Sequence, residues 1–84
     1  MSSPGKPPRN PTAMAFGARV RARRTELGWS QEVAAHECGV HWTYLGQVER
    51  GRRSPRVENI MRFAMGLQTT PGQLMDGLPV PPAP

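Results

Sequence analysis

The side chains best suited to chemistry in this chain lie between residues 42 and 53, and their chemistry is recognition rather than catalysis. At helical spacing, Trp42, Thr43 and Gln47 share one face. A glutamine amide pairs with N6 and N7 of adenine, a threonine methyl packs on thymine, and an indole packs on a thymine methyl or on sugars. We therefore interpret this face as a contact surface whose chemistry suits base edges in the major groove of double-stranded DNA.

Arginines are concentrated at the end of the same segment, where Arg50, Arg52, Arg53 and Arg56 lie within seven residues. Positive charge at the C-terminus of a helix is favourable for the helix dipole, but four guanidinium groups exceed that need. Because arginine binds phosphate bidentately, we predict that Arg50, Arg52 and Arg53 contact the DNA backbone.

Gly46 lies in the middle of the face that carries Thr43 and Gln47. A glycine in a helix interior costs about 1 kcal/mol relative to alanine. The missing side chain lets the helix backbone approach a neighbouring surface closely. We therefore interpret this face as a contact surface.

The whole chain has the charge of a protein that binds a polyanion. Its 84 residues include 11 lysines and arginines against 6 acidic residues, for a net charge of +5. This length provides one modest core, which excludes a two-domain enzyme. The sequence has no paired nucleophile and base, no phosphate-binding loop and no metal-ligand spacing, and His36 and His41 fall on different elements. We expect neither enzymatic activity nor a cofactor.

Cys38 is the single cysteine of the chain, so no internal disulfide can form. It ends an apolar helical face, where we expect a buried structural thiol. No apolar run approaches the length of a membrane span. These features predict a cytoplasmic protein that does not contact membranes.

Three helices are expected in the first part of the chain. Periodicity predicts a first helix that Thr12 caps and that ends before Gly28, a second over 31–38 that Gly39 closes, and a third over 42–50. Two short helices joined by a tight glycine turn form a helix-turn-helix, the minimal arrangement that lays a recognition helix in the major groove.

Two more helices are expected after the arginines, one from about Pro55 and a short one from Pro71. The core-facing residues predicted for the first of these are Val57, Ile60, Met61, Ala64 and Leu67. Five apolar residues exceed what a four-helix core needs: Phe63, Met65, Leu74, Met75 and Leu78. They are candidates for a dimer interface, with additional packing inside the monomer as the alternative.

The sequence leaves the positions of two side chains undecided. Arg24 lies at the edge of the first helix's apolar stripe, so its guanidinium must either reach solvent or meet a carboxylate. Trp42 either faces DNA or folds back over the helix at 31–38.

Proline-rich ends flank the domain. Residues 1–11 and 77–84 hold most of the ten prolines, and we expect both to be flexible tails around a domain at 12–76. Lys6 and Arg9 in the first tail allow an arm that reaches DNA, although an ordinary disordered terminus is the simpler interpretation.

The chain resembles the lambda-repressor/Cro-like helix-turn-helix family, also called the xenobiotic-response-element family. The matching residues are Phe16, Gly17, Arg24, Gly28, Ser30, Gln31, Glu32, Ala35, Gly39, Val40, Tyr44, Glu49, Arg50, Gly51, Pro55, Ile60, Ala64, Leu67 and Pro71. Within this family, residues 41–60 look especially similar to the controller proteins of restriction-modification systems.

The resemblance implies a compact all-α domain of five helices that binds a palindromic operator as a homodimer. It further implies that Gln31 contacts a phosphate, that Trp42, Thr43 and Gln47 occupy the base-facing positions, and that Arg24 and Glu49 form a buried ion pair. The same fold also serves as a protein-binding adaptor or an antitoxin, and the face around Trp42 leaves that alternative open.

Overall fold

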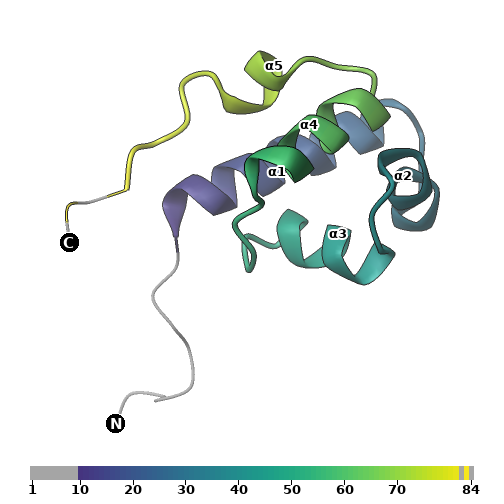
Figure 1. Cartoon of the computed structure of the whole chain (residues 1–84), viewed down its shortest axis with the longest axis horizontal. Helices are drawn as coiled ribbons and strands as arrows, with labels where there is room; N and C mark the ends of the chain where they lie inside the picture. The colour runs from purple at the N-terminus through teal and green to yellow at the C-terminus, as the bar shows by residue number, and fades with distance from the viewer. Residues whose placement is uncertain (1–9, 82, 84) are drawn as a thin grey trace, which may run out of the picture.

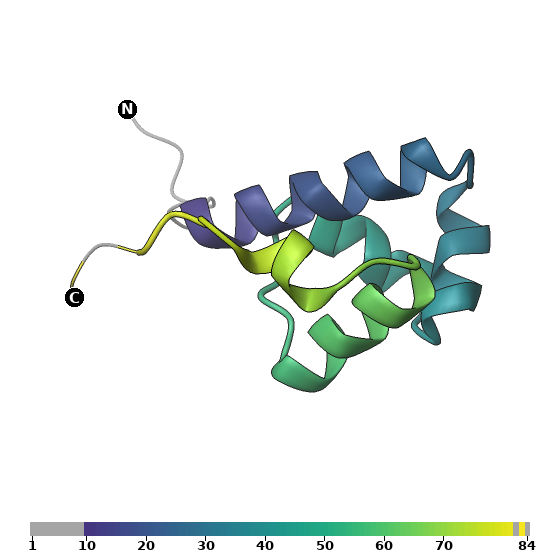
Figure 2. The same ribbon diagram turned by 90° about the horizontal axis from the view of Figure 1, so that it is seen from above.

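Five helices follow one another in the residues that the structure describes, 10–81 and 83, and no strand occurs among them. In this computed structural model the helices are α1 (Pro11–Glu26), α2 (Gln31–Cys38), α3 (Trp42–Glu49), α4 (Val57–Gly66) and α5 (Pro71–Met75). Figure 1 shows α1 running through the length of the domain, with α2 at one end and α3 below α1. In Figure 2, α5 lies between α1 and α4. The all-α, five-helix prediction is confirmed.

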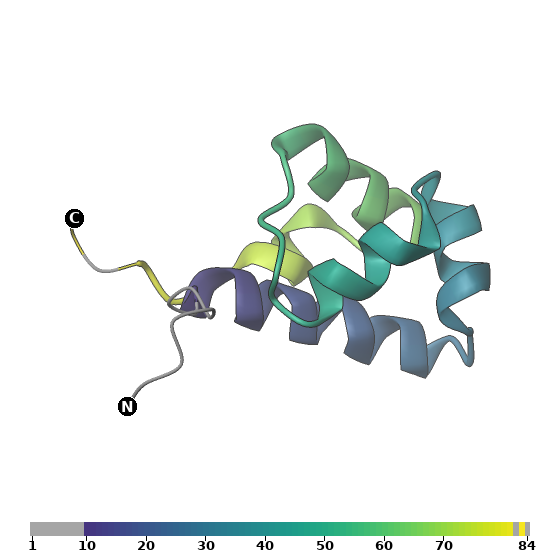
Figure 3. The ribbon, with the colours of Figure 1, turned by 90° about the horizontal axis from the view of Figure 1, so that it is seen from below.

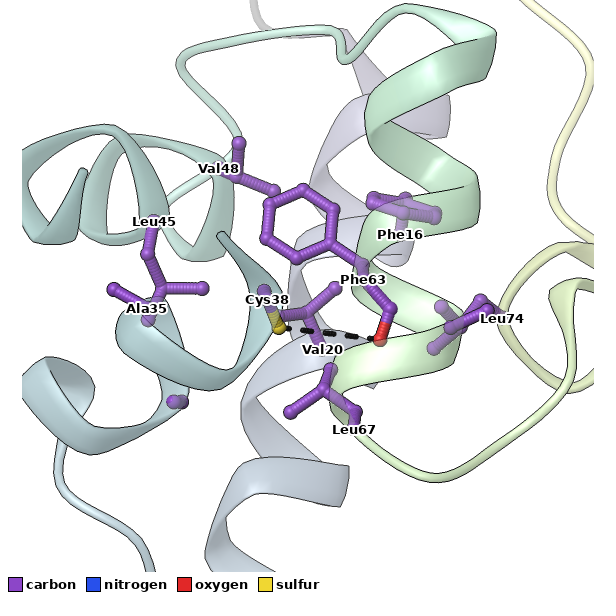
Figure 4. Packing of buried hydrophobic residues seen from close by; sticks show 11 residues of the cluster. Phe16, Val20, Ala35, Cys38, Leu45, Val48, Phe63, Leu67 and Leu74 are labelled. Atoms are coloured by element: carbon purple, nitrogen blue, oxygen red, sulfur yellow. Dashed lines mark hydrogen bonds between the residues drawn. The ribbon is translucent and has the colours of Figure 1, made fainter. Parts of the chain in front are cut away.

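The core forms where α1, α3 and α4 meet. Phe63 of α4 is fully buried at its centre, and its ring packs edge-on against Phe16 with the ring centroids 6.1 Å apart. Val20, Val48 and Leu67 surround the same ring (Figure 4) and are also fully buried. This single apolar cluster holds the helices in a fixed arrangement.

Capping residues explain why the helix-turn-helix forms where it does. The Ser30 hydroxyl accepts a hydrogen bond from the Val33 amide at 3.1 Å and begins α2. Gly39 ends α2 with a positive φ of 70°, a conformation that costs glycine nothing. His41 then caps α3, because its Nδ1 accepts from the Thr43 amide at 3.1 Å.

The start of α1 differs from the prediction. Asn10, not Thr12, is the N-cap, and its side-chain oxygen accepts from the amides of Thr12 and Ala13 at 3.0 and 3.2 Å. Pro11 suits the first helical position, where its missing N–H leaves no bond unmade. The Thr12 hydroxyl instead donates to the Pro79 carbonyl at 2.6 Å.

Residues 77–81 consequently differ from the flexible tail expected from the sequence. The Pro79 carbonyl is bound to α1, and Leu78 packs against the core from the chain beyond α5. The described parts of the two termini therefore lie side by side (Figure 1). The predicted tail at residues 1–9, with Lys6 and Arg9, lies outside the described residues.

The orientation of α4 also corrects the prediction. The helix begins at Val57 rather than near Pro55, and its cap, Arg56, makes no side-chain capping bond. Val57 and Met61, predicted to be buried, are 73% and 52% exposed. Ile60, Ala64 and Leu67 face inward as predicted, and Phe63 takes the place of Val57 and Met61, because a Phe ring buries more apolar area than either residue it replaces.

Two members of the predicted dimer interface are core residues. Phe63 is fully buried and Leu74 is 2% exposed, so neither has surface to offer a second chain. The alternative interpretation, packing within the monomer, is correct for both. Met65, Met75 and Leu78 keep some accessible surface.

Candidate nucleic-acid interface

The two faces of α3 have different environments. Leu45 and Val48 are fully buried against the core, whereas Thr43 is exposed and Gln47 is half-buried. Seen from below (Figure 3), α3 faces the viewer with α1 behind it. The side chains predicted to read bases therefore remain accessible on the outer face of one short helix.

Trp42 begins this outer face and stays on it. The side chain is 52% exposed and lies stacked on His41, with the ring centroids 6.1 Å apart and the planes 22° apart. It belongs neither to the buried core nor to the partly buried residues packed against that core. The stacked pair presents a flat aromatic surface next to Thr43.

Gly46 is buried by its own domain. A Cβ at this position would meet Arg50 Nη1 at 3.2 Å and the Gln31 amide at 3.6 Å. The space left by the missing side chain is therefore occupied by Gln31 of α2 and by Arg50, rather than left open for a partner as the sequence suggested. The glycine lets α2 and α3 cross closely.

Arg24 has the carboxylate partner that it requires. Its Nε and Nη2 donate to Glu49 Oε2 and Oε1 at 2.6 and 3.0 Å, and its Nη1 donates to the Trp29 carbonyl at 2.9 Å. The hydrogen bonds that Arg24 donates to Glu49 raise the pKa of Arg24 above its ordinary value. The ion pair implied by the family resemblance is present, with the two side chains 15% and 3% exposed.

Gln31 joins this ion pair. Its Nε2 donates to Glu49 Oε1 at 3.0 Å, and its side chain is half-buried. The residue that resemblance places on a phosphate therefore also holds the C-terminal end of α3 against α2. Only one of its two amide hydrogens is used in this bond, so a donor remains.

Arg53 lies across α3 rather than extending freely from the loop. Its Nη1 donates to Gln47 Oε1 at 3.2 Å, and its guanidinium carbon lies 5.3 Å from the centre of the Tyr44 ring. Tyr44 is itself fixed, because its ring stacks on Phe63 and its hydroxyl accepts from Asn59 Nδ2 at 3.1 Å. This arrangement joins a predicted phosphate contact to a predicted base contact.

Sequence reasoning missed the roles of Tyr44 and Asn59. Tyr44 stands out in the sequence only as a residue that matches the helix-turn-helix family, and no signal singles out Asn59. Their contact joins residues 15 apart in the chain, beyond the reach of helical periodicity. The remaining predicted phosphate contacts, Arg50 and Arg52, are exposed as expected.

Other kinds of site find no support in the part of the chain that the structure describes. Within residues 10–81 and 83, no three histidine, cysteine, aspartate or glutamate side chains gather where they could hold a metal. No helix in that range is both long and apolar enough to cross a bilayer. Cys38 is a buried free thiol, as predicted, and burial raises its pKa to about 11.

Comparison with known proteins gives a consistent answer. A family model described as a helix-turn-helix domain matches residues 15–78. The chain is 37% identical over 68 residues to control protein C.BamHI of Bacillus amyloliquefaciens, covering 80% of this chain and 84% of that protein.

Two solved structures extend the comparison. The restriction-modification controller protein C.AhdI from Aeromonas hydrophila superposes with a TM-score of 0.73 at 40% identity, covering 75% of this chain and 96% of the other. The P22 c2 repressor, solved with a synthetic operator, gives a TM-score of 0.68 at 34% identity, covering 74% and 94%. The chain therefore belongs to the lambda-repressor-like helix-turn-helix family of transcriptional regulators.

Proposed function

We propose that this protein is a sequence-specific regulator of the controller type that reads the major groove of double-stranded DNA with α3. Trp42, Thr43 and Gln47 contact bases, while Arg50, Arg52, Arg53 and Gln31 contact phosphates. The P22 c2 repressor, a structural neighbour, was solved with an operator. We place a regulator of this kind in the cytoplasm and expect it to act without a cofactor.

The observation that carries the proposal is the division of α3 into two faces. Leu45 and Val48 anchor the helix with no exposed surface, while Thr43 and Gln47 stay accessible. The arginines at the end of α3 supply affinity that is independent of sequence, and the side chains of the outer face supply discrimination between bases.

The exposed apolar stripe of α4 supports a homodimer on a palindromic site. Val57, Met61 and Met65 recur every fourth residue on one face and are 73%, 52% and 82% exposed. Met75, at 40% exposure, and Leu78 add apolar area from the following segment. A self-complementary surface of this kind favours a twofold dimer, which pairs two recognition helices with two half-sites.

Selection of bound oligonucleotides from a random pool tests the function directly. We expect one motif with twofold symmetry. The variant Gln47→Ala should then lose about 1 to 3 kcal/mol of binding free energy on the selected site and little on random DNA. Equal losses of binding free energy on the selected site and on random DNA would show that Gln47 does not contact a base.

A protein-binding role is the second candidate, and the exposure of Trp42 favours it. An aromatic side chain that is 52% exposed is also a common anchor of protein interfaces. An adaptor or antitoxin would bind a partner protein through this face without salt-sensitive affinity for DNA. The same selection experiment separates the two functions, since an adaptor returns no motif.

A further inference from the structure

The side chain of Gln47 is held in one orientation before any ligand arrives. Arg53 Nη1 donates to Gln47 Oε1 at 3.2 Å, which directs the amide nitrogen away from the guanidinium. An unrestrained glutamine presents its oxygen and its nitrogen equally well, so this bond selects one of two ways of reading a base.

Arg53 is held on its other side as well. Its guanidinium carbon lies 5.3 Å from the Tyr44 ring centre, and Tyr44 stacks on the fully buried Phe63 with an angle of 8° between the planes. The Asn59 amide fixes the Tyr44 hydroxyl at 3.1 Å. The guanidinium therefore rests on a rigid surface that extends from the core.

The backbone between the two residues adds to this rigidity. The amides of Gly51 and Arg52 donate to the carbonyls of Val48 and Gln47, both at 2.9 Å, which closes the end of α3 in a Schellman motif. Gly51 adopts a φ of 74° to make this turn. Gln47 thus binds the following loop through both its carbonyl and its side chain.

We infer that Arg53 is a positioning and specificity-determining residue that makes Gln47 prefer guanine. This inference rests on the proposed function. With Oε1 accepting from Arg53, one of its two acceptor positions is occupied, and the pair offers more N–H donors than acceptors: two donors on the Gln47 amide and the remainder on the guanidinium. Guanine presents two acceptors, N7 and O6, in the major groove. Adenine presents a donor, its N6 amine, beside the acceptor N7. That amine would face the N–H donors of Gln47 and Arg53.

This preference is the reverse of the one expected for an isolated glutamine. The bidentate contact to adenine requires Oε1 to accept from N6 while Nε2 donates to N7. Because Arg53 already donates to Oε1, the N6 group of adenine must compete with the guanidinium for this acceptor. The base preference of Gln47 is therefore determined by its hydrogen bond with Arg53 rather than by the glutamine side chain alone.

The experiment measures base preference at every position of the selected site for five forms of the full chain. The Gln47→Ala variant first identifies the base pair that Gln47 faces, as the position whose preference disappears. The parent should prefer guanine over adenine there by about tenfold. The Arg53→Ala variant should bring the two bases to within about twofold of each other, because the amide can then turn.

Arg52→Ala is the matched control, since it removes the same charge from the adjacent, exposed position. It should weaken binding to all sequences while leaving the guanine preference intact. In the Gln47→Ala background, Arg53→Ala should change affinity but no base preference. Both loop arginines are exposed, and circular dichroism melts verify that each variant keeps the fold.

Three results are distinguishable. The inference is supported if the parent prefers guanine at the position that Gln47 faces and if, of the two arginine variants, only Arg53→Ala loses that preference. Adenine at that position in the parent, or an unchanged preference in Arg53→Ala, overturns it while leaving the proposed function in place. A failure to select any motif overturns the proposed function, and the inference with it.

Discussion

Arg24 and Glu49 join the C-terminal half of α1 to the C-terminal end of α3 through two hydrogen bonds of 2.6 and 3.0 Å. Gln31 of α2 donates to the same carboxylate at 3.0 Å. Three helices are therefore fixed relative to one another at the C-terminal end of α3, whose outer face forms the candidate surface. The orientation of that surface depends on this polar contact as well as on apolar packing.

Removing the carboxylate should destabilise the protein strongly. Glu49→Ala leaves the guanidinium of Arg24 unpaired at 15% side-chain exposure, which costs about 3 to 5 kcal/mol of unfolding free energy. Glu26→Ala is the control, because its ion pair with Arg23 is exposed and contributes at most about 1 kcal/mol. Urea unfolding measures both, and a Glu49→Ala protein that unfolds like the parent would contradict the structural role.

Gly17 should tolerate no side chain. A Cβ there would lie 2.0 Å from the Val48 carbonyl oxygen and 2.9 Å from that of Glu49, so α1 and α3 would have to separate. Gly17→Ala should lower the unfolding free energy by about 1 to 3 kcal/mol.

Gly72→Ala in α5 is the matched control for this substitution. Its Cβ would approach only the mobile carboxylate of Asp76, at 3.2 Å, and helix propensity then favours alanine. Thermal melts that show both alanines to be equally harmless would remove the close approach at Gly17 as a constraint.

Cys38 should make stability depend on pH in the alkaline range. Burial, followed by the nearby charge of Glu37, raises its pKa from 9.0 to about 11. The unfolded chain loses the thiol proton first, so stability is unaffected below about pH 9 and falls as pH rises toward 11, by a total of about 2 kcal/mol. Urea unfolding of the parent and of Cys38→Ala across this range isolates the thiol, because only the parent should show this component.

Arg52 should contribute electrostatic affinity without base preference. Arg52→Ala is expected to weaken binding to the selected site and to random DNA by the same factor, and to reduce the slope of log K against log salt by about one. Fluorescence anisotropy at several salt concentrations measures the slope. Arg62→Ala, which removes an exposed charge from α4, should leave it unchanged.

The apolar stripe of α4 should control oligomeric state. Met61→Glu places a charge at the centre of the stripe formed by Val57, Met61 and Met65, and should convert a dimer to a folded monomer in sedimentation equilibrium. Val33→Glu changes a side chain of comparable exposure, 44%, on α2 and should remain dimeric. A parent protein that is monomeric at every concentration would exclude this dimer.

The local features of the fold follow from sequence because they depend on neighbouring residues. Ser30 and Gly39 bound α2 at the predicted positions, since a cap and a left-handed turn need only a few adjacent groups. The same reasoning misplaced the start of α1, where Asn10 and Thr12 are both acceptable caps; Pro11 at the first helical position and the Thr12 contact with Pro79 favour Asn10.

The sequence by itself determined five helices, a single buried thiol and a third helix with Thr43 and Gln47 on one face, because helical periodicity depends only on neighbouring residues. Only the tertiary structure decided which way α4 turns, since Phe63 and Met61 compete for one core and the larger ring is buried. It also decided that Gln47 bonds to Arg53, because that contact depends on where Tyr44 packs. Side-chain orientation at the site is set by packing between helices, which no local pattern encodes.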